Sequence, residues 1–317
     1  MRLTRKTFLT GLGGLLATPA LGTNGHAQPR QLTILSGPQG GTWYAAGGGL
    51  AAMFTRIGLR ANSEVGGAIT NIIQVSRGDA EAGFTFAAAL GMARQGQAPF
   101  PAPINNLRGL MTFQQSWAHV MVSRASGIER VEDLRGQPFA SQAPGNLTQV
   151  AFADLLTAAG LSEGDLRISR GSQTHGGDGV KDRRFVGVTA LSGIPGPMFM
   201  DVATSLPSRL LPVSDAHFER LRQINPGYTR MTIPAGTYPG QDEDVPTFGT
   251  SALIMVNENM PDDDAYWIVK AIGDRLEEFR NMTAANAGVT HEFMSRVDGI
   301  DLHPGAVRYY REIGVLS

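Results

Sequence analysis

The chain has 317 residues, of which 42% are hydrophobic and only 17% charged, with 40 glycines, 18 prolines and no cysteine. This composition supports a sizeable core and, at this length, about two domains. It excludes a disulfide scaffold and any cysteine-based nucleophile or metal site, and a net charge of −1 provides no basic surface for nucleic acid.

The first 27 residues have the three-part pattern of a secretory signal peptide. A basic start with Arg2, Arg5 and Lys6 is followed by an uncharged apolar run over 8–21 and by small residues before the end at Ala27. The run is too short to span a bilayer comfortably, although an N-terminal membrane anchor remains the alternative. We expect cleavage near Ala27 and a mature protein in the periplasm. The export route, general or twin-arginine, stays open.

The next part of the chain predicts three strand–helix units. Strands are expected at 32–35, 60–65 and 80–86, and helices at 42–57, 69–77 and 87–95. Each of the first two helices has one apolar face at helical spacing, and Thr42 can cap the first. Such an alternation implies a largely parallel sheet that is covered on both faces.

The rest of the chain predicts a second α/β lobe and a return to the first. Two apolar runs, at 107–113 and 118–122, are separated by polar residues. The other predicted elements are strands at 139–141, 166–169, 185–188, 209–213 and 251–256, and helices at 147–159 and 261–279. Three aspartates at 262–264 are interpreted as first-turn charge opposite the helix dipole.

These elements give a division into two lobes. We expect a signal peptide over 1–27, a first lobe made of 28–115 plus 250–317, and a second lobe over 116–249. The chain crosses between the lobes near 112–118 and 245–256.

Three predicted strand-to-helix junctions are rich in small residues. They read Gly40-Gly41-Thr42-Trp43, Gly66-Gly67-Ala68-Ile69-Thr70 and Pro144-Gly145-Asn146-Leu147-Thr148. The unpaired backbone N–H groups and the dipole of a helix N-terminus favour an anion, and ligands of open α/β sheets lie at the carboxyl ends of strands. The alternative is that the glycines only form tight turns and the threonines only cap helices. The aromatic residues after the first junction suit a ligand wall or the core equally.

Enzyme signatures are absent from the sequence. It contains neither a Gly-x-Ser-x-Gly elbow nor a phosphate-binding loop. His291-Glu292 begins like a zinc-protease motif, but Ser295 stands where the second histidine is needed. We therefore expect no catalytic residue, no metal site and no cofactor, and we expect that the protein is not an enzyme.

Five segments, in order along the chain, resemble the TAXI-type solute receptors of tripartite ATP-independent periplasmic (TRAP) transporters. The first spans 34–51 and includes Ser-Gly-Pro-Gln-Gly-Gly-Thr-Trp-Tyr at 36–44, and the others lie at 66–81, 126–136, 236–247 and 302–312. The resemblance implies a type II periplasmic-binding-protein fold: two α/β lobes joined by crossing strands, with a ligand cleft between them. Asn146-Leu147 departs from the Ser-Gly that is usual in the family, which leaves the ligand class open.

The resemblance also implies a function. It predicts an extracytoplasmic receptor that delivers a small organic acid (a dicarboxylate, a 2-oxo acid or an amino acid such as glutamate) to a TRAP membrane permease. We also expect the protein to be a monomer that binds no nucleic acid. An exported receptor that serves a sensor or other partner, and an exported hydrolase, are the alternatives. The ligand-binding candidates are Gly41, Thr42, Trp43, Tyr44, Gly67, Thr70, Asn71, Asn146, Leu147, Thr148 and Gly193.

Overall fold

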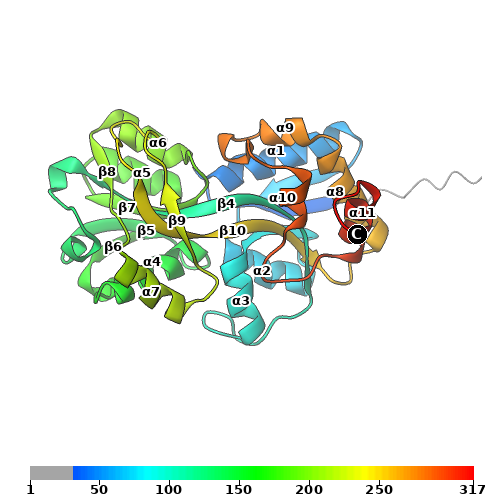
Figure 1. The fold of residues 1–317 in the computed structure, drawn as a ribbon, viewed down its shortest axis with the longest axis horizontal. Helices are drawn as coiled ribbons and strands as arrows, with labels where there is room; N and C mark the ends of the chain where they lie inside the picture. Colours follow the sequence, from blue (N-terminus) through cyan, green and yellow to red (C-terminus); the bar gives the residue numbers. More distant parts are fainter. Residues whose placement is uncertain (1–30) are drawn as a thin grey trace, which may run out of the picture.

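Two lobes lie side by side in the computed structural model, which describes residues 31–317, and two long strands run through both lobes (Figure 1). The predicted signal peptide lies outside the described residues. We call the part that contains α1, α2, α3 and the C-terminal helices the first lobe. The part that contains α4 to α7 is the second lobe.

The first lobe begins with the three predicted strand–helix units, which the structure confirms. They are β1 (Leu32–Leu35), α1 (Thr42–Arg56), β2 (Ala61–Glu64), α2 (Ala68–Arg77), β3 (Ala82–Phe86) and α3 (Ala87–Gln95). The three strands are parallel, in the order β2-β1-β3. In Figure 1, α1 lies above this sheet, whereas α2 and α3 lie below it.

The C-terminal part of the chain returns to the first lobe as four helices. These are α8 (Asp262–Gly273), α9 (Leu276–Arg280), α10 (His291–Ser295) and α11 (Pro304–Glu312). The prediction of one helix over 261–279 was wrong, because Arg275 leaves the helical conformation. Gly273, at the break, is pressed against the Tyr309 ring of α11, and glycine is a poor helix former.

Two central strands, β4 (Leu107–Ser123) and β10 (Val245–Asn257), connect the lobes. The two apolar runs predicted in the first of them form one strand. The polar residues between the runs, 114–116, stay in the strand because they pair with residues 250–252 of β10. In addition, the Gln114 amide donates to the Ser116 hydroxyl at 2.9 Å. β10 is antiparallel to both β3 and β4, so the sheet is mixed and not largely parallel.

The second lobe repeats the strand–helix pattern around the other end of the same sheet. Its elements are β5 (Pro138–Gln142), α4 (Leu147–Ala158), β6 (Arg167–Gly171), α5 (Gln173–Lys181), β7 (Gly187–Ser192), α6 (Pro197–Ser205), β8 (Ser208–Leu210), α7 (Asp215–Ile224) and β9 (Thr229–Ile233). The strand order β4-β7-β5-β6 continues from the central strands. Helices α4 and α7 lie on one face, and α5 and α6 on the other (Figure 1).

Sequence periodicity did not predict helix α5, which is important for the functional site. Three of its nine residues are glycines, so it has no apolar face of the usual kind. The glycines allow close packing instead, because a Cβ at Gly176 would lie 2.6 Å from Val188 and one at Gly179 would lie 2.1 Å from the Phe185 ring. The helix therefore rests directly on β7. Within residues 31–317, no helix has the length and apolarity to span a membrane.

Candidate functional site

Helices α1, α2, α4 and α5 begin at the boundary between the lobes, and the first three of them start without a side-chain cap. Helix α3 also begins there, after Phe86, and the N–H of Ala88 in its first turn donates to the Thr250 hydroxyl at 3.2 Å. The N-cap residues of α1, α2 and α4 are Gly41, Gly67 and Asn146, and none of them makes a capping hydrogen bond. The predicted cap, Thr42, is instead the first residue of α1. The first-turn N–H groups of an α-helix lack partners within the helix, so these helix starts can receive an acceptor from elsewhere.

A small buried cavity lies where the helix starts meet. Its volume is about 20 Å³, which is room for about one water molecule. Both lobes contribute to its lining, which consists of Pro38, Gly41, Thr42, Trp43, Ala68, Phe86, Gln142, Asn146, Leu147, Thr148, Gln173 and Leu191.

Two glutamine side chains in this lining are buried without a hydrogen-bond partner. Gln142 is the last residue of β5, and Gln173 is the first residue of α5. The two residues are only 3% and 5% exposed. The Gln142 Nε2 and the Gln173 Oε1 have no partner in the protein. Because buried polar side chains are normally hydrogen-bonded, these two amides indicate that another polar group binds here.

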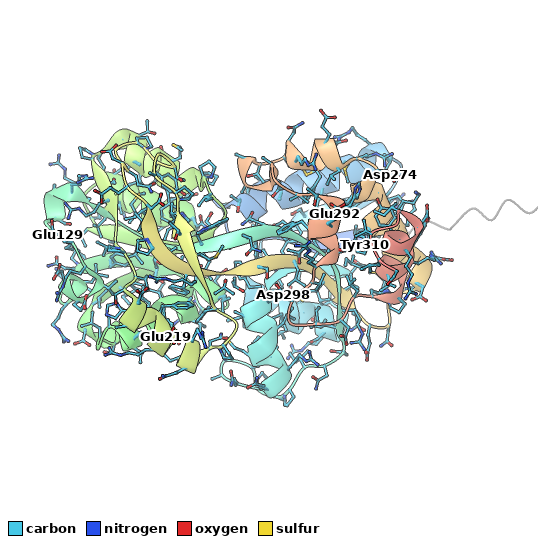
Figure 2. All side chains as sticks on the ribbon, viewed as in Figure 1. Glu129, Glu219, Asp274, Glu292, Asp298 and Tyr310 are labelled. Carbon is cyan, nitrogen blue, oxygen red and sulfur yellow. The ribbon has the colours of Figure 1, made fainter. Side chains whose placement is uncertain are left out.

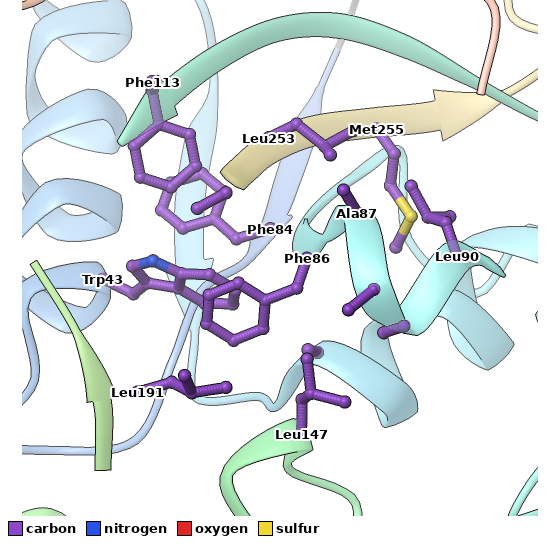
Figure 3. Close-up of a cluster of buried hydrophobic side chains, with 14 of the residues drawn as sticks. Trp43, Phe84, Phe86, Ala87, Leu90, Phe113, Leu147, Leu191, Leu253 and Met255 are labelled. Atoms are coloured by element: carbon purple, nitrogen blue, oxygen red, sulfur yellow. The ribbon is translucent and has the colours of Figure 1, made fainter. Parts of the chain in front are cut away.

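Apolar side chains form the remaining walls. Trp43 packs on Phe86 with their ring centroids 4.3 Å apart. From the second lobe, Leu147 and Leu191 face these two rings (Figure 3). A ligand in this place would therefore contact carbon on several sides.

The lining contains no ionisable side chain. Glu129, labelled on the second lobe, lies at the far end of that lobe, away from the boundary between the lobes (Figure 2). Electrostatic attraction for a ligand would therefore come from backbone dipoles and not from a charged residue.

The two lobes are held together by backbone hydrogen bonds at the cavity. The carbonyl oxygen of Gly145 accepts from the N–H groups of Ile69 at 3.1 Å and Thr70 at 3.3 Å, both in the first turn of α2. The N–H of Thr174 in α5 donates in the same way to the Gln39 carbonyl, at 3.4 Å. Two of the four helix starts thus already have an acceptor from the opposite lobe.

Six of the eleven residues predicted to bind a ligand line this cavity, and their role stays a prediction. They are Gly41, Thr42, Trp43, Asn146, Leu147 and Thr148. The Thr148 hydroxyl accepts from the backbone N–H of Leu191 at 3.0 Å, which ties the start of α4 to the end of β7.

The other five predicted residues lie near the cavity but outside its lining. Gly67 faces the Asn146 side chain of the other lobe, and the Thr70 hydroxyl donates to the Gly67 carbonyl at 2.9 Å. Tyr44 is 45% exposed on α1. Gly193 contacts Gln114 and Ala285, farther along the boundary between the lobes.

Asn71 has a fully committed side chain. Its Oδ1 accepts from the N–H of Gly67, and its Nδ2 lies within 3.1 Å of the carbonyl oxygens of Leu35, Ser36 and Phe84. The amide therefore connects α2 to β1 and β3, and it is 1% exposed. This geometry supports a role in holding the first junction in place.

Sequence reasoning missed Gln142, Gln173 and Leu191. Gln142 and Leu191 lie at the carboxyl ends of strands, where ligands of such sheets bind, so their position was a usable signal. Gln173 had no such signal, because α5 was not predicted.

The buried side chain of His119 connects segments within the second lobe. The Nε2 of His119 lies 2.8 Å from the Tyr238 hydroxyl and accepts from it, and this hydroxyl in turn accepts from the N–H of Gly196 at 2.8 Å. Its Nδ1 is 2.9 Å from the Trp117 carbonyl. Burial lowers the pKa of His119 to about 4, so the ring is neutral at pH 7 and links β4 to the loop that follows β7.

A larger hollow of about 840 Å³ lies at the opposite ends of the first-lobe strands, where Leu32 begins β1 and Asn257 ends β10. It is formed by the first lobe alone and contains none of the four helix starts. In the described part of the chain, no group of three His, Cys, Asp or Glu residues could hold a metal ion.

Solved structures share this fold at low sequence identity. A protein of Bordetella bronchiseptica RB50 matches with a TM-score of 0.53 and 14% identity, covering 91% of this chain and 90% of that one. A structure described as a periplasmic transporter matches with a TM-score of 0.50 and 13% identity, covering 90% and 94%. The alkanesulfonate-binding protein SsuA from Xanthomonas axonopodis pv. citri has a TM-score of 0.45 and 13% identity, covering 90% and 84%.

The fold is thus the two-lobed α/β fold of periplasmic binding proteins, as the sequence predicted. The sequence matches the model of a protein family over residues 34–314, which is nearly all of the described part of the chain. This chain belongs to the NMT1-like family.

Proposed function

We propose that this protein is an extracytoplasmic solute receptor that captures a small organic acid between its lobes and delivers it to a TRAP membrane permease. The observation that carries the proposal is the meeting of four helix N-termini, from both lobes, at one cavity with two unpartnered buried amides. Helix N-termini favour anions. A ligand that touches both lobes has higher affinity for the closed form, so its binding drives closure.

Several observations support the location and the partner in this proposal. The sequence has a signal-peptide pattern, one solved structure with this fold is described as a periplasmic transporter, and five segments resemble TAXI-type receptors. We propose a monomer with lobes 28–115 plus 250–317 and 116–249, and no catalytic role. Both proposed boundaries fall within or next to the crossing strands β4 and β10.

The binding part of the proposal is tested by the melting temperature of the mature protein. We expect millimolar concentrations of at least one organic acid to raise it, because a ligand that binds only the folded state stabilises that state. No shift with any acid in a broad panel would contradict the proposal.

The transport part requires a separate test in cells. We expect deletion of the receptor to abolish high-affinity uptake of the acid that the purified protein binds. Unchanged uptake would contradict delivery to a permease while leaving the binding function intact.

A further inference from the structure

The charge that the cavity can balance narrows the class of ligand. We propose that the cleft selects a small organic acid with one negative charge and an apolar body, and discriminates against acids with a second charged group. This inference rests on the proposed function and concerns the same site. It is narrower than the range of acids that the sequence predicts, which includes dicarboxylates and amino acids.

The lining of the cavity provides no counter-ion. No Lys, Arg, His, Asp or Glu side chain lines the cavity. A second carboxylate, or the ammonium group of an amino acid, would be buried there without a partner of opposite charge. Burial of an unpaired charge is strongly unfavourable.

Of the starts of α1, α2, α4 and α5, only two still lack a hydrogen-bond acceptor from the opposite lobe. The Gly145 carbonyl occupies the start of α2, and the Gln39 carbonyl receives the Thr174 N–H at the start of α5. The starts of α1 and α4 have no side-chain cap and no such acceptor from the opposite lobe. A helix N-terminus carries roughly half a unit of positive charge, so these two starts balance about one negative charge.

The amide and apolar groups of the lining suit an uncharged ligand body. The unpartnered Gln142 Nε2 can donate to a carboxylate, hydroxyl or oxo oxygen, and the unpartnered Gln173 Oε1 can accept from a hydroxyl group, in neither case with added charge. Trp43, Phe86 and Leu191 leave an apolar environment for the rest of the molecule. The cavity volume of about 20 Å³ is room for about one water molecule, so the lobes must separate to admit an acid and the lining must rearrange to enclose it.

Two 2-oxo acids of similar size test this selectivity. The probes are α-ketoisocaproate and α-ketoglutarate, which share a 2-oxo acid group and a methylene group and then carry an uncharged isopropyl group and a charged carboxymethyl group, respectively. In titration calorimetry with the mature protein we expect α-ketoisocaproate to bind at least about tenfold more tightly, a difference of about 1.4 kcal/mol. Equal or tighter binding of α-ketoglutarate would overturn the inference while supporting the proposed function. Binding of no organic acid at all would contradict both.

A charge introduced at the cavity provides the second test. Gln142→Glu keeps the size of the side chain but adds a negative charge, and we expect it to weaken binding of α-ketoisocaproate at least about tenfold. The control is Gln223→Glu on the exposed surface of α7, with no effect on binding expected. Melting curves establish that both variants fold. Unchanged affinity in folded Gln142→Glu would overturn the assignment, and the comparison of the two acids stands even if this variant does not fold.

Discussion

Substitution of Gly145 by alanine should prevent the lobes from closing fully. A Cβ at this position would lie 2.6 Å from the Thr70 methyl group across the boundary between the lobes. Ordinary carbon–carbon contacts begin at about 3.5 Å, so the two segments must move apart by roughly 1 Å.

That movement determines the expected magnitude. The hydrogen bonds from Ile69 and Thr70 to the Gly145 carbonyl are already 3.1 and 3.3 Å long, and an added ångström would break both. At about 0.5–1.5 kcal/mol for each bond, closure becomes less favourable by about 1–3 kcal/mol. Because ligand affinity is linked to closure, we expect binding of α-ketoisocaproate to weaken by roughly five- to 150-fold.

The backbone strain of this substitution needs its own control. Gly145 has φ +95°, and Gly136 has φ +75° with nothing within 4 Å of an added Cβ. Both alanine variants should therefore lose stability through left-handed strain of about 1–2 kcal/mol, but only Gly145→Ala should weaken binding and increase the radius of gyration measured by X-ray scattering with ligand. Equal affinity of the two variants would refute the reasoning.

Three further predictions concern stability. Asn71→Ala removes four hydrogen bonds from a buried junction and should lower the free energy of unfolding in urea by about 3 kcal/mol or more, so a loss below about 1 kcal/mol would contradict the structural role. Thr148→Val leaves the Leu191 N–H without its acceptor and should lower the free energy of unfolding by about 1–3 kcal/mol and weaken ligand binding. The control Thr157→Val, on the exposed side of α4, should change neither quantity. Similar results for the two variants would contradict this role of the Thr148 hydroxyl. Burial lowers the pKa of His119 from 6.5 to about 4, so the unfolded chain takes up a proton first as the pH falls. The free energy of unfolding should therefore decrease between about pH 7 and pH 4, by up to about 3 kcal/mol. Urea unfolding of His119→Gln should show a smaller decrease over this range, and an unchanged decrease would exclude His119 as its source.

The starts of α1, α2 and α4 could be predicted from sequence because they depend on local chemistry. Gly41, Gly67 and Asn146 stand between a strand and a helix with buried apolar residues, and that order indicates where each helix begins. The edge of the sheet at which they meet then follows from the alternation of strands and helices.

The remainder of the site depends on contacts between distant segments. Helix α5 has glycines where helices usually have an apolar face, so its packing on β7 is needed to identify it and to place Gln173 at the cavity. Asn71 lies at a junction that was predicted correctly, but the direction of its side chain follows from the carbonyls of β1 and β3. The occupation of the α2 start by the Gly145 carbonyl could not be inferred without both lobes in place.

Hydrogen–deuterium exchange with and without α-ketoisocaproate tests most directly whether the cavity between the lobes is the binding site. The account predicts slower exchange at the first turns of α1 and α4, which begin at Thr42 and Leu147, where the ligand carboxylate would accept backbone N–H groups. Protection confined to the hollow beside Asn257 on the first lobe, or unchanged exchange at both helix starts under saturating acid, would contradict it.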